Sequence, residues 1–353
     1  MKQPVNLEDY ETLAHEKLSR SAYAYFSSGA ADEYTKYDNE FMYEKIQIMP
    51  HVLHDVSERD ISTTLLNQKI DFPVVIAPMA MAALAHPDKE LAMARAAKQA
   101  NIPMCLSTLS TTTLENVAET DVNGWFQLYV HKDRGVSRAL VQRAEAAGYQ
   151  ALVVTVDVPV TGYREALLRQ PLILPDGLEL ANLTDYWHPA EYPRVTDYVA
   201  AQFDASLTWA DIEQFVTETS LPVFLKGILR ADDAIRALDT GIAGMIVSNH
   251  GGRQLDTVPA TITVLPEIAD AINGRCTLMV DGGIRRGTDV LKALACGADA
   301  IMLGRPLMWA LAADGQFGVE TALAMLRHEY DIALALSGCA TNADLSRDIL
   351  RFP

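Results

Sequence analysis

The chain has 353 residues, of which 49% are hydrophobic and 21% charged, close to the averages of soluble globular proteins. This composition excludes a disordered chain, a collagen and a coiled coil. Asp and Glu number 46 against 29 Lys and Arg, so the net charge is −17. Such a surface repels nucleic acids and anionic lipids, so we expect neither as a partner, and an anionic substrate would need a locally cationic pocket.

The sequence carries no sign of targeting, membrane insertion or metal binding. The N-terminal stretch lacks the apolar core of a signal peptide, and no 18-residue apolar run is present that could span a membrane. The closest two cysteines, Cys276 and Cys296, are too far apart for a CxxC zinc or redox motif. We therefore expect a cytoplasmic protein with buried, reduced thiols and no metal site.

Eight short apolar runs, rich in Val, Ile, Leu and Phe, follow a first stretch that includes a helical segment at 7–30. The runs span 72–78, 103–108, 124–130, 151–159, 221–227, 244–250, 277–283 and 300–306. Each run is too short for a typical helix, and its near-continuous apolar character indicates a strand that is buried on both faces, as in parallel sheets.

Amphipathic helical patterns lie between and after these strands. They span 88–100, 136–149, 208–220, 230–241, 287–298 and 318–338. Thr208 followed by Asp211 resembles an N-cap with an acidic first turn, while Gly148 and Gly241 mark helix ends. Eight strands that alternate with helices predict an α/β fold of the (β/α)8, or TIM-barrel, class.

We expect residues 1–353 to form a single domain with two additions to the barrel. Residues 1–71 form an N-terminal helical extension, and the barrel occupies 72–340. The connection at 158–207, after the fourth strand, contains five prolines and is therefore not a single helix. A connection of this length in a compact domain is typical of a lid or binding loop.

The active site of this fold lies at the carboxyl ends of the strands. Those ends carry polar, charged and turn-forming residues, a pattern that packing alone would not favour. In chain order they are Pro78, Met79 and Ala80; Ser107 and Thr108; Gln127 and Tyr129; Thr155 and Asp157; Lys226; Ser248, Asn249 and His250; Asp281, Gly282, Gly283 and Arg285; and Gly304 and Arg305.

The last two strand ends have a pattern that suits phosphate. The seventh continues as DGGIRRG at 281–287, and the eighth ends in Gly304 and Arg305. In barrels these two loops often bind phosphate through backbone N–H groups and a helix N-terminus, and arginine adds bidentate charge. The chain has no GxGxxG fingerprint and no P-loop, so a nicotinamide Rossmann site is disfavoured.

The most specific segment is SNHGGRQ at 248–254. His250 is the natural proton acceptor near neutral pH, and Arg253 is suited to grip a carboxylate. For a lone histidine, a structural role in the core would be the better interpretation. Here the histidine follows a strand end, which favours a catalytic role.

Several segments together share the pattern of one known family. They are SNHGGRQLD (248–256), DGGIRRGTDVLKALACGA (281–298), LGRP (303–306), FQLYV (126–130), TVDVP (155–159), SAYAYFSSGA (21–30), IAPMA (76–80) and ALSGC (335–339). Over essentially its whole length the chain resembles the FMN-dependent α-hydroxy-acid oxidases, which include glycolate oxidase and L-lactate oxidase.

The resemblance implies an FMN that lies across the barrel mouth. Its ring would contact Pro78, Met79, Ala80, Ser107, Gln127 and Thr155, with Ser248 also on the cofactor side. Lys226 would face the N1–O2 edge of the flavin, where positive charge stabilises the negative charge that develops on reduction. The ribityl chain and phosphate would be held by Asp281, Gly282, Gly283, Arg285, Gly304 and Arg305.

The resemblance also implies the residues on the substrate side. Arg164 and Arg253 would clamp the substrate carboxylate, Tyr25 and Tyr129 would bond to the carboxylate or hydroxyl, and His250 would be the catalytic base, oriented by Asp157. Two arginines suit an anionic ligand on an acidic protein, and an Asp–His pair favours the imidazolium that forms on proton removal.

Two positions depart from the glycolate oxidase pattern and flank the expected substrate side chain. Leu109 stands where Trp is typical, and Met79 stands where Thr is typical. Leu leaves room for a methyl group, which favours lactate, although a pocket discriminates one methyl by only about 1–3 kcal/mol. Phe203, in the lid loop, is expected to close on that methyl group.

We therefore expect FMN-dependent oxidation of L-lactate to pyruvate with reduction of O2 to H2O2. No cytochrome-like domain or membrane-binding insert is evident, which favours O2 as the electron acceptor. The resemblance suggests a homotetramer. Glycolate oxidase and lactate 2-monooxygenase are the alternatives within the family; a flavin-dependent isomerase and a flavin-storing or ligand-sensing barrel are the alternatives outside it. The sequence leaves open whether the substrate is oxidised by hydride transfer or through a carbanion.

Overall fold

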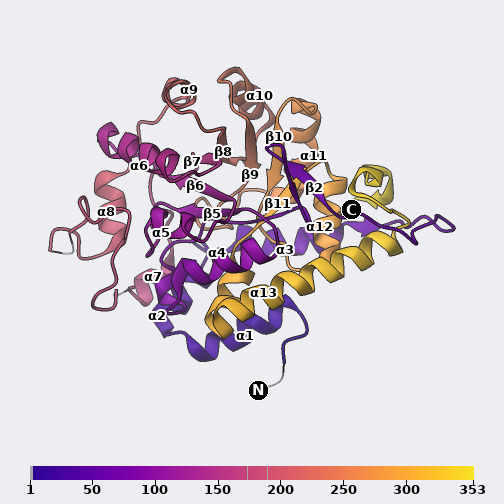
Figure 1. Cartoon of the computed structure of the whole chain (residues 1–353), viewed down its shortest axis with the longest axis horizontal. Coiled ribbons are helices and arrows are strands. Elements are labelled where there is room, and N and C mark those ends of the chain that lie inside the picture. Colours follow the sequence, from indigo (N-terminus) through magenta and orange to yellow (C-terminus); the bar gives the residue numbers. More distant parts are fainter. Residues whose placement is uncertain (1–2, 173, 189) are drawn as a thin grey trace.

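Eight parallel strands close into a barrel at the centre of the computed structural model, which describes residues 3–172, 174–188 and 190–353 (Figure 1). The strands are β4 (Val74–Ile76), β5 (Met104–Ser107), β6 (Gly124–Leu128), β7 (Ala151–Thr155), β8 (Val223–Ile228), β9 (Gly244–Val247), β10 (Thr277–Val280) and β11 (Ala300–Leu303). They pair in chain order, and β11 pairs with β4 to close the ring. The predicted (β/α)8 barrel and all eight of its strands are confirmed.

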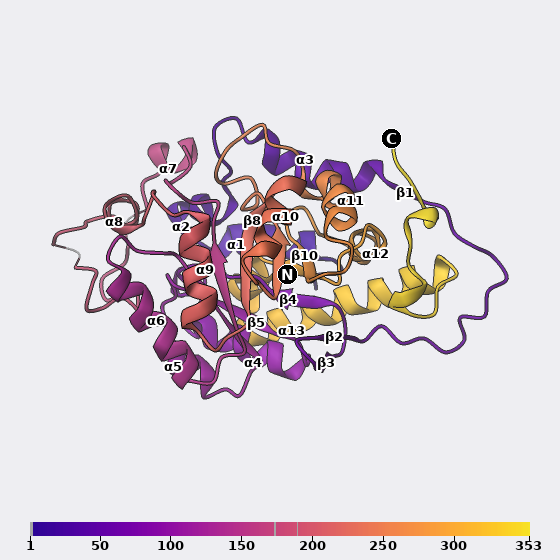
Figure 2. The same cartoon turned by 90° about the horizontal axis from the view of Figure 1, so that it is seen from above.

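Helices surround this barrel (Figure 2). They are α4 (Lys89–Gln99), α5 (Leu114–Ala118), α6 (Arg134–Ala146), α9 (Trp209–Glu218), α10 (Ala231–Asp239), α11 (Thr261–Ile272), α12 (Gly287–Ala295) and α13 (Arg305–Leu336). The predicted cap of α9 is confirmed, because the Asp211 carboxylate accepts a hydrogen bond from the Thr208 N–H at 2.7 Å. Gly148 and Gly241 end α6 and α10 with φ of +84° and +81°.

Among the helices that surround the barrel, the sequence patterns miss α5, α11 and the beginning of α13. The five-residue α5 is too short to show a helical period, and α11 contains Pro266, which argues against a helix in sequence. Helix α13 begins at Arg305, well before the predicted 318. A kink at Asp314 and Gly315 separates its first part from the segment that the sequence identifies.

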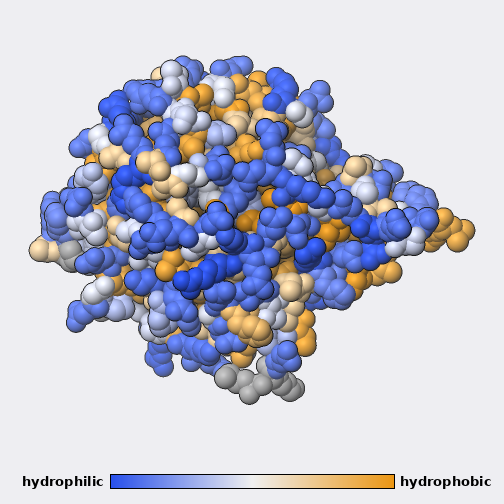
Figure 3. All heavy atoms as spheres, viewed as in Figure 1, coloured by the Kyte–Doolittle hydropathy of each residue, from blue (hydrophilic) through white to orange (hydrophobic). Residues whose placement is uncertain are grey.

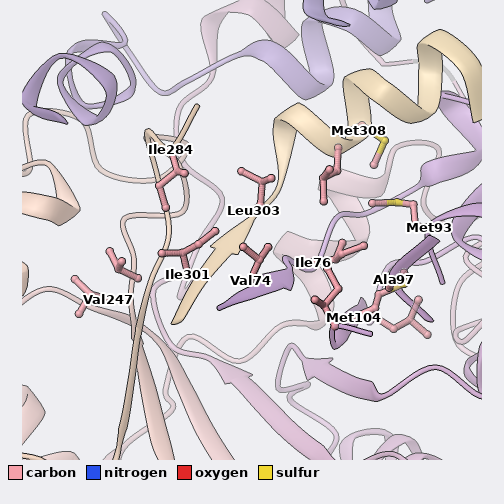
Figure 4. Close-up of a cluster of buried hydrophobic side chains, with 14 of the residues drawn as sticks. Val74, Ile76, Met93, Ala97, Met104, Val247, Ile284, Ile301, Leu303 and Met308 are labelled. Atoms are coloured by element: carbon pink, nitrogen blue, oxygen red, sulfur yellow. The ribbon is translucent and has the colours of Figure 1, made fainter. Parts of the chain in front are cut away.

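The strand residues point alternately into two apolar layers, as the continuous apolar runs require. One layer fills the barrel interior and includes Trp125 and Phe224, whose ring centroids lie 4.9 Å apart. The other packs between strands and helices. Figure 4 shows Val74, Ile76 and Leu303 of this outer layer beside Met93 of α4 and Met308 of α13.

The N-terminal segment forms three helices, of which the third is not predicted. They are α1 (Leu7–Lys17), α2 (Arg20–Ser27) and α3 (Tyr34–Lys45). Helix α1 packs against α13, and the predicted segment at 7–30 breaks where Ser19 caps α2 by accepting from the Ala22 N–H. Helices α2 and α3 reach the carboxyl ends of the strands, where Tyr25 and Asn39 enter the site.

Short strands flank the barrel. The hairpin of β2 (Thr63–Leu65) and β3 (Gln68–Ile70) adds Leu65 and Ile70 to the interior layer. Near the C-terminus, β12 (Leu350–Arg351) pairs antiparallel with β1 (Gln47–Ile48).

The long connection after β7 is not a single helix, as predicted. It contains α7 (Glu165–Arg169) and α8 (Val195–Gln202), which lie together at one end of the molecule in Figure 2. A β-bridge between His131 and Phe203 ties its far end back to the loop after β6. The surface shown in Figure 3 is mostly hydrophilic. Across the described ranges, no helix combines the length and apolar content of a membrane span.

Replacing the interior ring of Phe224 should weaken the barrel. Phe224→Ala leaves a cavity beside Trp125 and should lower the free energy of unfolding by about 3–5 kcal/mol. Ile235, which is 44% exposed on α10, provides the control, because Ile235→Ala should change the same quantity by less than about 0.5 kcal/mol. Urea unfolding of both variants measures the difference, and equal midpoints would contradict the interior packing.

Candidate active site

A cavity of about 450 Å³ opens at the carboxyl ends of the barrel strands. This volume lies within the range of small-molecule and cofactor sites. Its walls come from the strand ends, from α2 and from the connection after β7. The predicted site residues that line it are Tyr25, Pro78, Met79, Ala80, Ser107, Leu109, Tyr129, Thr155, Arg164, Lys226, His250, Arg253, Asp281, Gly282, Gly283, Arg285, Gly304 and Arg305, and Phe203 lines it as well.

Gln127, Asp157 and Ser248 lie one layer behind this surface, and each is bonded to a lining residue. The Gln127 amide donates to Thr155 Oγ1 at 2.9 Å, and Ser248 Oγ accepts from Lys226 Nζ at 2.7 Å. Asp157 Oδ1 lies 3.0 Å from His250 Nδ1. These three residues therefore orient their neighbours from behind, and the other predicted site residues line the cavity itself.

The SNHGG turn has an unusual backbone that brings His250 to the cavity. His250, Gly251 and Gly252 have φ of +58°, +64° and +74°, in the left-handed region. A Cβ on Gly252 would lie 2.6 Å from the backbone nitrogen of Lys36, so only glycine lets α3 approach the turn. Histidine is among the residues that tolerate this region better than most.

Asn39 holds this turn and is a site residue that the sequence does not reveal. Its side-chain amide exchanges two hydrogen bonds with the Asn249 amide, at 2.9 and 2.8 Å. Asn249 Oδ1 also accepts from the Gly252 N–H at 3.1 Å. The two asparagines come from segments more than two hundred residues apart, and α3 itself is not predicted, so no local signal exists for this contact.

His250 presents one ring nitrogen to the cavity. Its Nδ1 faces the Asp157 carboxylate, which favours the tautomer that carries a proton on Nδ1 and leaves Nε2 free to accept one. Nε2 lies 3.4 Å from the Tyr129 hydroxyl. Burial raises the pKa of Tyr129, so this hydroxyl keeps its proton and acts as a donor.

A second histidine nearby is structural. His131 Nδ1 lies 3.0 Å from the Tyr129 carbonyl, and Nε2 lies 3.0 Å from the Tyr198 hydroxyl. Burial lowers the pKa of His131 to about 4, so the ring is neutral near pH 7. Both ring nitrogens are engaged, which leaves His250 as the histidine that faces the cavity.

Two arginines beside Tyr25 form a cationic wall of the cavity. The guanidinium carbons of Arg164 and Arg253 lie 5.7 and 5.1 Å from the centre of the Tyr25 ring. Burial and the charge of Arg253 lower the pKa of Arg164 to about 10. Arg164 Nε and Nη1 are buried without a hydrogen-bond partner among the described residues. Buried donors of this kind fit an anion such as a carboxylate.

An ion pair lies at the centre of the barrel mouth. Lys226 Nζ is 2.6 Å from Asp281 Oδ2, and the two side chains are only 6% and 11% exposed. Burial by itself would lower the pKa of Lys226, but the carboxylates of Asp281 and Asp157 outweigh it and raise that pKa. Lys226 is therefore a permanent buried cation. Asp281 Oδ1 is buried without a partner in the described part of the chain, so it is free to accept from a hydroxyl.

The glycine-rich loop after β10 forms a cradle beside this pair. Gly282 and Gly283 have φ of +92° and +84°, and a Cβ on Gly283 would lie 2.0 Å from the Asn39 carbonyl oxygen. The backbone here has no room for a side chain. Helix α13 begins directly after Gly304, so the positive end of its dipole lies at the anion-binding end of the cavity.

Arginines complete the cradle. Arg305 donates to the carbonyls of Phe26 and Gly251 at 3.1 and 2.8 Å, and Arg285 pairs with Glu40 at 2.6 Å. Burial and the charges of Arg253 and Arg285 lower the pKa of Arg305 to about 9. Mutually repelling guanidinium groups at a glycine cradle fit a phosphate, whose negative charge would relieve the repulsion.

These features define a cofactor-dependent barrel enzyme with one site for a phosphate group and another for a small anion. Residues 14–352 match the FMN-dependent dehydrogenase family. The chain is 48% identical to L-lactate oxidase from Nostoc sp. over 98% of each chain, and 46% identical to glycolate oxidase from Spinacia oleracea over 97% of this chain and 94% of that one. A crystal structure of mandelate oxidase matches with a TM-score of 0.93 and 40% identity, covering 99% and 98% of the two chains.

The chain therefore belongs to the FMN-dependent α-hydroxy-acid oxidase family. The predicted family, enzyme class and cofactor are confirmed: it is an FMN-dependent (S)-2-hydroxy-acid oxidase. The relatives are named for three different acids, so the comparisons establish the class of substrate and not the particular acid.

The two neighbouring arginines after β10 should differ in their effect on FMN binding. The Arg285 side chain is 13% exposed at the cradle, whereas that of Arg286 is 47% exposed and pairs with Glu329. Arg285→Met should weaken FMN binding to the apoprotein at least about tenfold, or roughly 1.4 kcal/mol, because a charge-assisted contact is lost. Arg286→Met should bind FMN as the parent protein does. Quenching of flavin fluorescence measures both, and equal affinities would place the phosphate elsewhere.

Proposed function

We propose that the protein is an L-lactate oxidase, which converts L-lactate and O2 to pyruvate and H2O2. The observation that carries the proposal is an apolar wall in the same cavity as the arginine pair. Leu109, Met79 and Phe203 line the cavity from three different segments, and Leu109 and Phe203 are only 5% and 4% exposed. Such a wall suits a methyl group next to a carboxylate.

The wall is fixed in place by its neighbours. Phe203 stacks on Tyr129 with ring centroids 4.8 Å apart, and the Leu109 carbonyl accepts from the Met81 N–H at 3.0 Å. The apolar side chains give a methyl group a surface to contact, whereas glycolate has none to offer. A difference of this kind is worth about 1–3 kcal/mol, which is enough to set a preference.

The arginine pair binds and orients the substrate in this proposal. Arg164 and Arg253 hold the carboxylate, with the Tyr25 and Tyr129 hydroxyls as further donors. A carboxylate held at two points fixes the rotation of the molecule, so the carbon that bears the hydroxyl faces Nε2 of His250. Positioning of this kind supplies much of the rate enhancement when two groups must meet in one geometry.

His250 is the catalytic base. It takes the proton at Nε2, and the imidazolium that results is stabilised by the Asp157 carboxylate 3.0 Å from Nδ1. The Tyr129 hydroxyl, 3.4 Å from Nε2, donates to the reacting oxygen. These roles apply whether the substrate carbon loses hydride or is first deprotonated.

FMN, when bound, supplies the redox chemistry by accepting the two electrons of the alcohol. The residues that would hold it are Pro78, Met79, Ala80, Ser107, Thr155, Lys226, Asp281, Gly282, Gly283, Arg285, Gly304 and Arg305, with Gln127 and Ser248 behind them. Lys226 keeps a positive charge in the barrel mouth, and the ion pair with Asp281 fixes the position of its ammonium group.

The chain forms a single domain (1–353) with an N-terminal helical extension (1–71) and a barrel (72–340). Within the barrel segment, the connection at 158–207 acts as a lid. It supplies both Arg164 and Phe203 to the cavity, so its position decides whether the substrate is enclosed.

The proposal includes a cytoplasmic homotetramer. Reduced thiols support that location, since all four cysteines are unpaired. Light scattering of the holoenzyme tests the assembly.

A panel of 2-hydroxy acids tests the proposed substrate. The holoenzyme should have its highest kcat/KM with L-lactate, consume one O2 per lactate and release pyruvate and H2O2 in equal amounts. Glycolate should react more slowly because it lacks the methyl group. A preference for glycolate would make the protein a glycolate oxidase, and release of acetate and CO2 would make it a lactate monooxygenase.

Removing the base should abolish flavin reduction without loss of the cofactor. His250→Gln should keep one FMN per chain, because His250 faces the substrate, and should reduce its flavin at least about 10²–10⁴-fold more slowly. Anaerobic stopped-flow bleaching of the flavin by L-lactate measures this rate. The exposed His328 on α13 provides the control, since His328→Gln should react normally. Fast bleaching in His250→Gln would assign the base to another residue.

Filling the methyl site should change the preferred acid. Leu109→Trp places a bulky ring over the methyl group, and overpacking of this kind costs about 1–3 kcal/mol. The ratio of kcat/KM for lactate over glycolate should therefore fall roughly tenfold, since about 1.4 kcal/mol is a factor of ten. Leu109→Met, which conserves volume, is the control and should keep the ratio. An unchanged ratio in Leu109→Trp would show that Leu109 does not face the substrate methyl.

A further inference from the structure

A buried carboxylate joins the two loops that carry Met79 and Leu109. Glu90 lies near the start of α4 and is 1% exposed. Its Oε1 accepts from the backbone N–H groups of Ala82 and Thr111, at 3.1 and 2.8 Å. Ala82 follows Met79 in the loop after β4, and Thr111 follows Leu109 in the loop after β5. One side chain from outside the cavity therefore holds both loops.

Threonine hydroxyls complete this cluster. Those of Thr111 and Thr112 donate to Glu90 Oε2 at 2.9 and 2.8 Å. Thr111 Oγ1 also accepts from the Ala83 N–H at 3.0 Å, which gives a second link between the loops. The loops are thus cross-linked at the carboxylate as well as by the backbone bond to the Leu109 carbonyl.

Burying the Glu90 carboxylate costs free energy, and its hydrogen bonds to the two loops explain why a carboxylate is present here. All the donors to Glu90 named above are uncharged, and the Lys89 ammonium beside the cluster bonds to the Thr111 carbonyl at 3.4 Å. Taking a carboxylate out of water is expensive, so the hydrogen bonds to Glu90 must compensate for that cost. An apolar side chain at this position would avoid that cost but would leave the buried N–H groups of Ala82 and Thr111 unpaired. Glu90 therefore gives the loops a fixed geometry that an apolar residue cannot give.

The same loop is the platform for the lid. The Ser110 carbonyl accepts from the Ala181 N–H at 3.0 Å, and Ser110 Oγ accepts from the Asn182 amide at 2.8 Å. Asn182 Oδ1 in turn accepts from the Leu114 N–H at 2.9 Å. A shift of the loop that Glu90 holds would thus move the apolar wall and the lid together.

We propose that Glu90 is a positioning residue that sets which substrate side chain the enzyme accepts. It holds Met79 and Leu109 at a fixed separation, so the wall keeps the size of a methyl group and does not collapse or open. The inference rests on the proposed function, because it requires Met79 and Leu109 to face the substrate side chain. Glu90 does not touch the substrate and acts through these two residues.

Variants at Glu90 separate this role from a general effect on folding. Glu90→Ala removes the cross-link. Glu90→Gln keeps the shape of the side chain, and its amide oxygen can still accept from the backbone N–H groups. Its amide nitrogen can donate to the threonine hydroxyls after these hydroxyl groups rotate, so this variant should keep the cross-link and the selectivity. Glu145 is a partly buried control carboxylate at the opposite end of the barrel, where its Oε1 likewise accepts from a backbone N–H, that of Ser220 at 2.7 Å, and from the Thr219 hydroxyl at 2.6 Å.

The readout is selectivity among acids of increasing length. We measure kcat and KM for glycolate, L-lactate and (S)-2-hydroxybutanoate, together with the Kd of the corresponding 2-oxo acids from perturbation of the flavin spectrum. In Glu90→Ala the lactate-to-glycolate ratio of kcat/KM should fall roughly fivefold or more. This change is a substantial part of the discrimination that a pocket can achieve through one methyl group. The change should lie mainly in KM, and the Kd values should follow it. Glu90→Gln and Glu145→Ala should keep the ratio.

An equal loss for all three acids in Glu90→Ala would overturn the inference, and so would a ratio that changes as much in Glu145→Ala. If Glu90→Ala fails to fold, Thr111→Val removes one donor to Glu90 and the acceptor for Ala83 while keeping side-chain shape. It should shift the ratio in the same direction by a smaller factor. A parent enzyme that prefers glycolate would reject the lactate assignment, whereas an unchanged ratio in Glu90→Ala, or in Thr111→Val if Glu90→Ala does not fold, would reject the role of Glu90.

Discussion

Five cations, of which Lys226 is buried and the four arginines are partly buried, lie together in a strongly acidic protein, and much of the architecture serves to keep them there. Arg164, Arg253, Arg285, Arg305 and Lys226 all line one cavity of a chain whose net charge is −17. The local positive potential that they create is what admits an anionic cofactor and an anionic substrate to such a protein. The same groups repel one another, and this repulsion adds to the effect of burial in lowering the pKa values of Arg164 and Arg305. The fold must hold them together until anions neutralise them.

Backbone carbonyls from the N-terminal segment do part of this holding. The Tyr25 carbonyl accepts from Arg253, and the Phe26 carbonyl accepts from Arg305. Helix α2 is therefore part of the active site and not an appendage to the barrel. Helix α3 has a comparable role, because Asn39 holds the turn that carries His250 while its carbonyl borders the glycine cradle. Segments outside the barrel thus help to fix the positions of the side chains that the strand ends carry.

Phe203 of the apolar wall stacks on Tyr129, but Met79 and Leu109 are held by other contacts than the polar residues of the cavity. Ion pairs and strand ends place Lys226, Asp157 and His250, and these contacts do not involve Leu109. The wall depends instead on the loops after β4 and β5, which the buried carboxylate of Glu90 connects. In the proposed function this separation lets one catalytic arrangement serve different 2-hydroxy acids, because the side chains at Met79 and Leu109 can change without moving His250.

The amino-acid pattern alone is enough to specify the barrel and most of the residues that line its mouth. Eight apolar runs predict eight buried strands, and parallel strands in a barrel bring their carboxyl ends to one face, so the residues that follow each run must gather there. These signals are local, because they depend on hydrophobic period and on the residue after each strand. They suffice to identify His250, Lys226, Asp281 and the glycine loop as residues of the site.

Which of these residues face the cavity, and what holds them, depends on tertiary contacts. Gln127, Asp157 and Ser248 prove to lie behind the surface, and Asn39 and Glu90 prove to support it. The contact between Asn39 and Asn249 joins segments that are distant in the chain, and the Glu90 cluster joins two loops through side-chain hydrogen bonds. Neither leaves a periodic or local pattern in the sequence, because such bonds depend on how elements pack and not on the order in which residues occur.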